Sequence, residues 1–493
     1  MKGMFKPTIE ESKRIAEAGQ YKVIPVSTEI YANMTTPIEV MKVLKTVSQH
    51  CFMLESAEDA KTWGRYTFLG FDPKMEITAL NGGVRIKSDT EESFETDNPN
   101  RCIQETLDRH KSVKFDWLPP FTGGLVGYFS YDYAKYSEPS LRLDACDEER
   151  FNDVDLMLFD KVIAFDHYRQ KIVLIVNIST ENIEATYADG ISELENLKNL
   201  IKNKTQEQTF PAHIKSEFKA LFTKGEFCRM VEEAKGFIKE GDIFQVVLSN
   251  RFEADFEGSI FDTYRVLRTI NPSPYMLYFS GSDVEIAGAS PETLVKLQDG
   301  KLFTFPLAGT RPRGATDEED IALEKELLAD EKELSEHNML VDLGRNDLGK
   351  ISKFGTVEVE KYMSVLRFSH VMHIGSTVRG EICEDKTGLD AINAVLPAGT
   401  LSGAPKIRAM QIINELEQNK RGIYGGAIGY LDFTGNMDTC IAIRIAYKKA
   451  GKVFVRSGAG IVADSNPQSE YQECLNKAKA MFAALKQSEG GLD

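Results

Sequence analysis

The sequence has little cysteine, and the cysteines it has are scattered. Its 493 residues include seven, an odd number, and none of them form a CxxC pair. This distribution argues against a disulfide framework and against a cysteine-ligated zinc site. It is typical of a protein kept in a reducing compartment, so we expect a cytoplasmic location.

Long apolar runs, basic clusters and nucleotide loops are also missing. No stretch approaches the length of a membrane span, and residues 1–19 have no apolar signal-peptide core. The formal net charge is −16 without any cluster of Lys and Arg, which disfavours nucleic acid and anionic membranes as partners. Neither GxxxxGK[ST] nor a strand-linked GxGxxG occurs, so nucleotide chemistry is disfavoured.

Apolar residues make up 42% of the chain, which is enough for a large core. Short alternating apolar runs separated by glycine turns predict antiparallel strands, and amphipathic segments between them predict helices. We therefore expect an α+β fold with antiparallel sheets flanked by helices. The polar stretch 202–219 is the best boundary, and it predicts two domains over 1–210 and 220–493.

One stretch near the C-terminus combines glycines with charged residues. Ser457–Lys477 reads SGAGIVADSNPQSEYQECLNK, which predicts a strand end, a glycine turn and a helix capped by Asp464 or Ser465. Gly458 and Gly460 lack a Cβ atom and therefore let a bound group approach the backbone closely. We expect this turn to lie at a binding site.

Two predicted helices each carry a Glu-x-x-Glu pair on one face. The pairs are Glu333 and Glu336, in a helix predicted over Glu318–Leu343, and Glu470 and Glu473, in the C-terminal helix. Mg²⁺ takes only one or two protein carboxylates and keeps several waters, so one glutamate from each helix is enough to bind it. The alternative is a solvated helix face in which Glu473 pairs with Lys477, four residues on.

Four further polar residues lie in apolar or glycine-rich surroundings. They are Gln245 in a strand predicted over Ile243–Phe252, Arg444 in a strand predicted over Thr439–Tyr447, His373 in SHVMHIGS, and Thr400 in LPAGTLSGAPK. An arginine between alanines suits the capture of a carboxylate. Each residue also has an ordinary structural alternative, such as a satisfied buried amide or a hydroxyl in a turn.

Nine short blocks, in order, give the chain a resemblance to a known family. They are GDIFQVVLS, SPET, PLAGTRPRG, EHNMLVDLGRND, HVMHIGS, LPAGTLSGAPK, YGGAIGY, AIRIA and the glycine turn described above, and they span most of Phe222–Leu485. In these blocks the chain resembles the chorismate-utilising enzymes, which include the anthranilate, aminodeoxychorismate, isochorismate and salicylate synthases. The resemblance implies antiparallel sheets packed as a sandwich flanked by helices, in two interleaved subdomains.

The resemblance also implies a role for each candidate residue. Glu336 and Glu473 are expected to bind Mg²⁺, while Glu333 and Glu470 act through water. The implied catalytic residues are Gln245, Glu292, His373 and Lys477, and the implied chorismate ligands are Thr400, Tyr424, Arg444, Gly458 and Gly460. Glu292 is expected to protonate the departing C4 hydroxyl, and His373 to act in the elimination of pyruvate.

Two positions favour anthranilate formation with ammonia. Water-adding members of the family carry a lysine where this chain has Gln245, and aminodeoxychorismate synthases commonly carry one where it has Ala308. No Gly-x-Cys-x-Gly elbow is present, so the nucleophilic cysteine of a glutaminase is missing. The resemblance therefore implies a separate glutamine amidotransferase subunit, in a heterotetramer.

The first half of the chain resembles the tryptophan-inhibition site of the same family. The matching blocks are Leu54–Ser56, Ser130–Tyr133 and Asn271–Met276. The residues implied to bind L-tryptophan are Glu55, Ser56, Pro274, Tyr275, Met276, Ile428 and Tyr430. On this basis 1–210 is expected to be regulatory and 220–493 catalytic.

Three alternatives remain open at this point. The chain could be an aminodeoxychorismate synthase, because those enzymes can retain part of the tryptophan pocket. It could instead be a tryptophan-binding regulatory protein with a decayed active site, although the candidate residues oppose this. The reaction could also stop at 2-amino-2-deoxyisochorismate.

Overall fold

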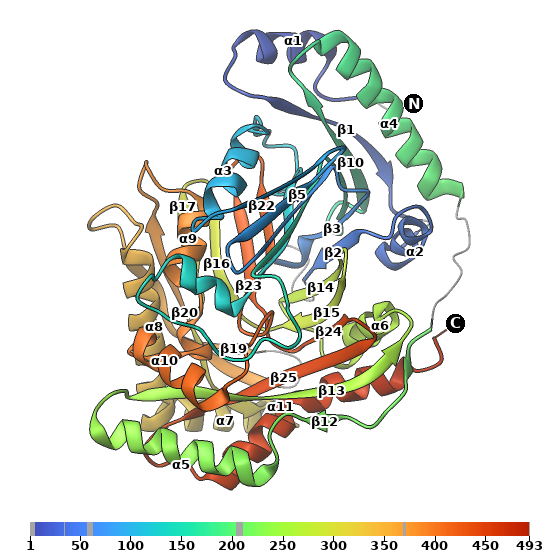
Figure 1. The fold of residues 1–493 in the computed structure, drawn as a ribbon. Helices are drawn as coiled ribbons and strands as arrows, with labels where there is room; N and C mark the ends of the chain where they lie inside the picture. Colours follow the sequence, from blue (N-terminus) through green and yellow to red (C-terminus); the bar gives the residue numbers. More distant parts are fainter. Residues whose placement is uncertain (1–4, 34, 57–62, 204–210, 368–370, 493) are drawn as a thin grey trace.

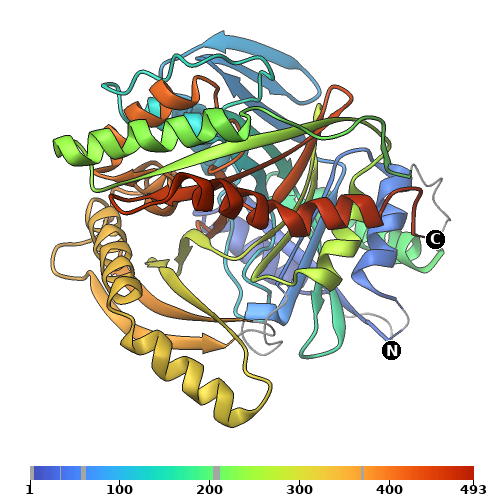
Figure 2. The ribbon, with the colours of Figure 1, turned by 90° about the horizontal axis from the view of Figure 1, so that it is seen from below.

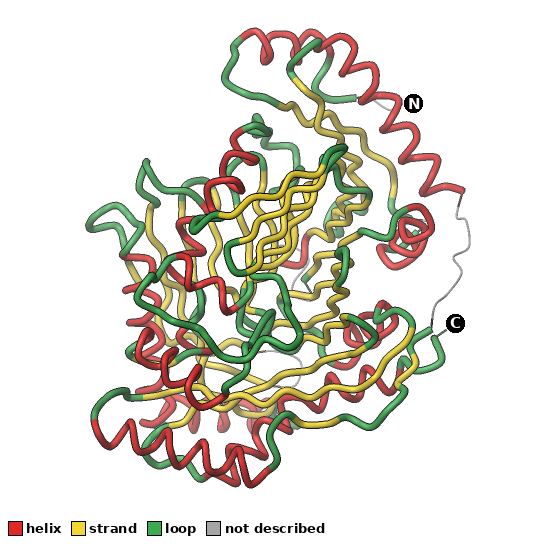
Figure 3. Tube along the Cα trace, in the orientation of Figure 1, coloured by secondary structure: helices red, strands yellow, loops and turns green. Residues whose placement is uncertain are grey.

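The computed structural model describes residues 5–33, 35–56, 63–203, 211–367 and 371–492. Within these ranges two large antiparallel sheets form the interior, and helices cover their outer faces (Figure 1 and Figure 3). The predicted α+β class, with antiparallel sheets flanked by helices, is confirmed. No helix of the described part is both long and apolar enough to cross a membrane.

The first sheet has 13 strands among the described residues. In pairing order they are β1 (Val23–Tyr31), β10 (Lys171–Ser179), β9 (Lys161–Asp166), β3 (Tyr66–Phe71), β2 (Cys51–Glu55), β14 (Tyr275–Ser280), β15 (Val284–Ser290), β24 (Ile445–Lys449), β25 (Lys452–Ile461), β13 (Gln245–Glu257) and β11 (His213–Ile214), with β12 (Lys219–Ala220) and β21 (Gly403–Ala404) also paired to β13.

The second sheet has 12 strands in the same described part. In pairing order they are β18 (Leu307–Pro312), β20 (Val371–Glu381), β17 (Lys301–Thr304), β16 (Thr293–Gln298), β23 (Met437–Ile441), β22 (Ala427–Asp432), β7 (Gly124–Phe129), β8 (Val154–Phe159), β4 (Met75–Leu80), β5 (Gly83–Lys87) and β6 (Glu91–Glu95), with β19 (Glu358–Arg367) paired to β20.

Each sheet contains strands from both halves of the chain. β2 pairs with β14 in the first sheet, and β7 pairs with β22 in the second. Part of the polar stretch 202–219 lies outside the described residues. The division into 1–210 and 220–493 stays a prediction, because strands from both segments are hydrogen-bonded together in each sheet.

Helices flank both sheets. They are α1 (Ile9–Glu17), α2 (Pro37–Val47), α3 (Asn100–Asp108), α4 (Ile183–Asn203), α5 (Lys224–Glu240), α6 (Phe261–Ile270), α7 (Asp317–Ala329), α8 (Glu331–Gly349), α9 (Gly388–Val395), α10 (Lys406–Glu417) and α11 (Pro467–Gln487), with short 3₁₀ turns η1 (Trp63–Arg65), η2 (Tyr131–Tyr136) and η3 (Gly399–Leu401). Figure 2 shows α5 and α11 side by side over β13, and α7 and α8 beside the end of the second sheet.

The acidic helix predicted over Glu318–Leu343 is in fact two helices, α7 and α8. Asp330 leaves the helical conformation, and its carboxylate accepts the N–H groups of Lys332 at 3.1 Å and Glu333 at 3.3 Å. The side chain thereby satisfies orphan donors at the start of α8. The break lies just before the glutamate pair, so α8 presents that pair on a separately oriented helix.

The cap of α11 also differs from the expected one. Asn466, rather than Asp464 or Ser465, accepts the N–H groups of Gln468 at 3.0 Å and Ser469 at 3.2 Å. The predicted helix is present, but it begins one residue later than a Ser465 cap implies. The glycine turn predicted at Gly458 and Gly460 is wrong, because both residues pair with β13 and lie within β25, which continues to Ile461.

The strand predicted over Thr439–Tyr447 is divided between the two sheets. β23 ends at Ile441 in the second sheet, and β24 begins at Ile445 in the first. Arg444 lies at the end of this crossing with φ +51, a left-handed conformation that is uncommon for a residue other than glycine. Apolar residues continue through the crossing, so the sequence pattern did not reveal it.

Candidate active site and a second cavity

β13 and β25 form the floor of the candidate active site. β13 begins at Gln245, two residues later than predicted, and this side chain is only 8% exposed. A Cβ atom at Gly460 would lie 2.7 Å from Nε2 of Gln245. A Cβ atom at Gly458 would lie 2.7 Å from the carbonyl oxygen of Leu248 and 2.9 Å from the hydroxyl of Tyr424. The two glycines therefore let the amide and the phenol lie directly against the backbone of β25.

Glu292 is a carboxyl group beside the candidate substrate ligand Thr400. The hydroxyl of Thr400, in η3, donates to its Oε1 at 3.2 Å. Burial raises the pKa of Glu292 to about 7, although the Thr400 hydrogen bond and the positive charges of Arg444 and Lys477 oppose the shift. Glu292 can therefore carry a proton near neutral pH, as a general acid requires.

His373, in β20, has a defined tautomer. Its Nδ1 lies 2.9 Å from the carbonyl oxygen of Gly309 and 3.0 Å from the hydroxyl of Thr310. Because a carbonyl only accepts, Nδ1 carries the hydrogen and Nε2 is the basic nitrogen. Burial lowers the pKa of His373, the Gly309 bond opposes that shift, and the nearby Arg444 charge adds to it. The imidazole is thus neutral and suited to accept a proton.

Two cations lie near the candidate residues, Lys477 beside Gly458 of β25 and Arg444 near Glu292 and His373. Nζ of Lys477 donates to the carbonyl oxygen of Gly458 at 3.1 Å and pairs with Glu473 at 2.7 Å. The Arg444 side chain is exposed, and its positive charge acts to lower the pKa values of both Glu292 and His373. These two cations, together with the backbone of Gly458 and Gly460 that no side chain covers, are suited to bind an anion.

The acidic faces of α8 and α11 are close enough for their charges to interact. Burial, then Glu333, and to a smaller degree Glu473 of α11, raise the pKa of Glu336. Burial and Glu473 raise that of Glu470, and the charge of Lys332 on α8 opposes both shifts. The two helices therefore share one electrostatic region, in which a cation would relieve the repulsion between carboxylates.

The residues present fit a Mg²⁺ ion held partly by other ligands. Within the described ranges, no three His, Cys, Asp or Glu side chains converge into a set able to hold a metal by themselves. Mg²⁺ does not need such a set, because it usually takes one or two protein carboxylates together with waters and substrate oxygens. Glu336 and Glu473 can supply that number, one from each helix.

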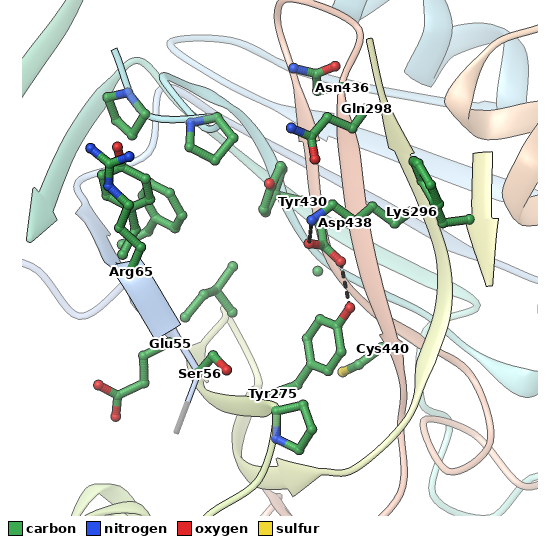
Figure 4. A pocket seen from close by; sticks show the side chains of 18 of the residues that line it. Glu55, Ser56, Arg65, Tyr275, Lys296, Gln298, Tyr430, Asn436, Asp438 and Cys440 are labelled. Atoms are coloured by element: carbon green, nitrogen blue, oxygen red, sulfur yellow. Dashed lines mark hydrogen bonds and ion pairs between the residues drawn. The ribbon is translucent and has the colours of Figure 1, made fainter. Parts of the chain in front are cut away.

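A second cavity of about 660 Å³ lies between β2, β14, β22 and β23 (Figure 4). It brings together all seven residues implied to bind tryptophan, which are Glu55, Ser56, Pro274, Tyr275, Met276, Ile428 and Tyr430. Sequence reasoning missed other residues of its wall, among them Arg65, Lys296 and Asp438. Each is an ordinary strand or loop charge in the sequence, without a local signal.

Two details of this cavity differ from the expected pattern. The carboxylate of Glu55 points away from the cavity in Figure 4, toward Tyr264 and Arg268, whose Nη2 donates to it at 3.1 Å. The Ser130–Tyr133 block is not among the described residues that line the cavity. Its Tyr131 ring instead covers the guanidinium of Arg421 at 4.7 Å, beside the candidate active site.

A model of the chorismate binding enzyme family matches residues 6–483 of this chain. Anthranilate synthase component 1 of Acetivibrio thermocellus is 46% identical over 98% of this chain and 99% of its own length, and that of Aquifex aeolicus is 44% identical over 98% of each. The chain belongs to the chorismate binding enzyme family, among its anthranilate synthase component 1 members.

Solved structures of related proteins have the same architecture. Anthranilate synthase component I from Streptococcus pneumoniae is 40% identical, with a TM-score of 0.75 over 92% of this chain and 98% of that one. The isochorismate synthase MenF from Escherichia coli is 18% identical, with a TM-score of 0.68 over 97% and 98% of the two chains. The second likeness concerns the fold alone.

Beneath the candidate site of this chorismate binding enzyme lies an ionic network that sequence reasoning missed. Glu417, Arg421 and Arg456 are each at most 2% exposed. Nη2 of Arg421 donates to Glu417 at 2.6 Å, and Nη2 of Arg456 does so at 2.7 Å. Glu417 and Arg421 are four residues apart, a common surface spacing, so only the tertiary structure identifies them as buried.

Proposed function

We propose that this chain is the large subunit of an anthranilate synthase. It converts chorismate and ammonia, through 2-amino-2-deoxyisochorismate, to anthranilate and pyruvate, the first step of tryptophan biosynthesis. The observation that carries the proposal is that the charge of Arg444 acts on both Glu292, an acid with a pKa near 7, and His373, whose pKa is lowered by burial. The amide of Gln245 lies against Gly460 of β25, and Gly458 of the same strand lies against Tyr424 and accepts from Lys477. The relationship to anthranilate synthases over nearly the whole chain supports the same reaction.

Chorismate binding is assigned to the side chains of Arg444 and Lys477 and to the backbone at Gly458 and Gly460. Arg444 and Lys477 supply charge for the enolpyruvyl carboxylate, and the Tyr424 hydroxyl lies against Gly458. Burial raises the pKa of Tyr424, which keeps its hydroxyl protonated as a donor. A Cβ atom at Gly458 or Gly460 would occupy the space beside these donors.

In the first half-reaction ammonia adds at ring C2 and the C4 hydroxyl leaves. Glu292 donates its proton to the departing oxygen, and Thr400 orients the carboxyl. Gln245 can hydrogen-bond ammonia, but an amide cannot deprotonate water. This chemistry accounts for a preference for ammonia as the nucleophile.

In the second half-reaction pyruvate is eliminated and the ring becomes aromatic. Nε2 of His373 accepts the C2 proton as the C3–O bond to the enolpyruvyl group breaks. The Gly309 carbonyl holds the imidazole in the tautomer that this role needs. His373 therefore acts as a base only after the amine has been installed.

Glu336 and Glu473 would hold Mg²⁺, with Glu333 and Glu470 contacting it through water. When bound, the ion supplies Lewis-acid stabilisation of charge on the ring carboxylate. Burial, and then the neighbouring carboxylate of Glu333, raise the pKa of Glu336, and the second of these causes favours cation binding.

Ammonia is proposed to come from a partner glutamine amidotransferase subunit in a cytoplasmic heterotetramer. The component 1 designation of the relatives supports a partner chain. The second cavity is proposed to bind L-tryptophan as a feedback inhibitor. Its mixed wall of aromatic, polar and charged residues, which includes Arg65 and Asp438, suits an aromatic amino acid.

One incubation series tests the proposal. The purified chain with chorismate, Mg²⁺ and ammonium is expected to form anthranilate, measured by fluorescence and mass, and to lose activity with tryptophan added. Glutamine should not replace ammonium without a partner subunit. A product that retains the pyruvyl ether, or no loss of chorismate, would contradict the proposed reaction.

A further inference from the structure

The ionic network beneath the cleft extends to the catalytic wall. Nη1 of Arg421 donates to the carbonyl oxygen of Leu401 at 2.6 Å, and its Nη2 donates to that of Val247 at 2.7 Å. Leu401 directly follows Thr400 in η3, and Val247 lies two residues beyond Gln245 in β13. We propose that Arg421 is a positioning residue that holds Thr400, and through it Glu292, in the reactive arrangement.

The network is well built for this task because its groups are mutually satisfied. Glu417 accepts both guanidinium groups and the N–H of Ser249 at 2.8 Å. Burial acts to raise the pKa of Glu417, but Arg421 and Arg456 overcome it, and the pKa is lowered. A buried carboxylate paired in this way stays ionised and fixes the planes of both guanidinium groups.

Two aromatic rings make cation–π contacts with the guanidinium of Arg421. The Tyr131 ring centre lies 4.7 Å away and that of Tyr424 lies 5.8 Å away, both in the range of a cation–π contact. Tyr424 is also the phenol that lies against Gly458. Arg421 thus contacts two parts of the proposed site, the η3 loop and the phenol.

The Thr400 loop is also held by hydrogen bonds of Leu401 and Ser402 to the carbonyl oxygen of Ala398 and by the pairing of β21 with β13. The N–H of Val247 donates to the carbonyl oxygen of Ser402 at 2.9 Å, and Gly399 packs against Leu343 of α8. With the Arg421 bond, η3 is held between β13 and α8. An error of about 1 Å in a catalytic group can cost on the order of 100-fold in rate.

The test is a double-mutant cycle of Arg421→Lys and Thr400→Val in the full chain, assayed with chorismate, Mg²⁺ and ammonium. The inference rests on the proposed function, so anthranilate formation by the unmodified chain is measured first. If the unmodified chain forms none, the proposed function has failed, irrespective of Arg421.

We expect Arg421→Lys to lower kcat by about 100-fold, because lysine cannot make both hydrogen bonds to Leu401 and Val247. KM for chorismate should change by less than about threefold, because the lysine keeps a cation beside the Tyr424 ring. In the Thr400→Val background the same change should lower kcat by less than about threefold further, because coupled residues are not additive. Thermal unfolding is measured for every variant.

Arg456→Lys is the matched control. Arg456 shares Glu417 and the same burial, but its other bonds go to Ser249, Asn419 and the backbone of Lys420. Arg456→Lys should therefore lower kcat by the same factor in the unmodified chain and in the Thr400→Val background. If Arg421→Lys does not fold, Glu417→Gln is used in the cycle, since it keeps the volume and removes the charge that orients Arg421.

Equal losses of kcat from the Arg421 change in both backgrounds would overturn the positioning role. So would a folded Arg421→Lys protein with kcat within about threefold of the unmodified chain, or a cycle identical to that of Arg456→Lys. A non-additive cycle for Arg421 with an additive one for Arg456 would support it.

Discussion

The hydroxyl groups of Tyr275 and Thr293 lie 2.8 Å apart, and this hydrogen bond joins the second cavity to the segment that carries Glu292. Tyr275 also donates to Asp438 at 2.8 Å (Figure 4). A phenol has one proton, so Thr293 must be the donor to Tyr275. Any ligand that displaces Tyr275 therefore acts on the residue next to Glu292.

Tyr275→Phe should weaken tryptophan inhibition. The variant keeps the ring but loses the bond to Thr293 that connects the cavity to the segment of Glu292. If ligand binding breaks or strengthens that bond, about 1 kcal/mol of coupling is lost, and we expect the tryptophan concentration for half inhibition to rise by about fivefold. Tyr66→Phe, in the same cavity wall, is the control, and an equal effect of both variants would show that Tyr275 has no special role.

Glu292→Gln should lower kcat by about 10²- to 10⁴-fold, because the amide cannot donate a proton to the leaving oxygen. In the unmodified chain the protonated fraction falls as pH rises through the pKa of about 7, so kcat should fall over the same range. The variant should lack this dependence. A pH profile that is unchanged in Glu292→Gln would exclude Glu292 as the acid.

The same substitution should stabilise the fold at neutral pH. The pKa of Glu292 is raised from 4.5 to about 7 in the folded state, so folding takes up a proton between these values and stability falls as pH rises through them. Removing the titration should stabilise the variant by up to about 3 kcal/mol above pH 7. Urea unfolding at pH 5 and pH 7.5 measures the difference, which should be smaller at pH 5.

Glu336→Gln and Glu473→Gln should each weaken Mg²⁺ binding more than Glu333→Gln and Glu470→Gln do. Loss of a residue that acts through water typically costs about 10- to 100-fold in metal affinity, and loss of a direct ligand should cost more. Calorimetric titration with MgCl₂ measures this without reference to activity. Equal affinities for all four variants would contradict the assignment.

Gly458→Ala should raise KM for chorismate and destabilise the protein. Its methyl group would lie 2.7 Å from the Leu248 carbonyl oxygen, a backbone atom that cannot move aside, and such overpacking costs about 1–3 kcal/mol. Gly236→Ala is the control, because no atom lies within 4 Å of its added Cβ in α5. The Gly236→Ala variant should be more stable than the unmodified chain by about 0.5–1 kcal/mol. If Gly236→Ala and Gly458→Ala both lose stability, a local clash at Gly458 is not the cause.

Asp155→Asn should stabilise the protein increasingly as pH rises. Within the described structure neither carboxyl oxygen of Asp155 has a hydrogen-bond partner, and burial raises its pKa well above 3.8. Folding therefore takes up a proton at pH values where the unfolded chain is ionised, and stability falls as pH rises through that window. Thermal unfolding of the variant and the unmodified chain at pH 5 and pH 7.5 measures this.

Asp153→Asn is the opposite control in the same region. Asp153 accepts the N–H of Asn81 at 2.7 Å and the hydroxyl of Tyr136 at 2.8 Å, and it pairs with Lys135 at 2.7 Å. Loss of its charge should therefore destabilise the fold. If Asp155→Asn and Asp153→Asn shift the melting temperature in the same direction, the hydrogen-bond partners of the carboxylate do not determine the sign of the effect.

The residues predicted for the site needed the family resemblance as well as local pattern. Helical spacing placed Glu333 with Glu336 and Glu470 with Glu473 on their faces. The turn predicted at Gly458 and Gly460 was wrong, because the two glycines lie in strand β25. Which of these residues lie near one another depends on pairing between strands far apart in sequence, as between β13 and β25. No local rule specifies such pairing.

By itself the sequence determined the α+β class, the antiparallel strands, the acidic helix faces and the absence of nucleotide loops, because each depends on periodicity or composition within a short window. Only the tertiary structure decided where Arg444 turns between sheets, how Arg421 comes to lie under Thr400, and that Tyr275 reaches Thr293. All three features depend on which strands, distant in sequence, lie side by side in the fold. Residue types that are usually found at the surface, such as Glu417 and Arg421, are buried as an ion pair by the same packing.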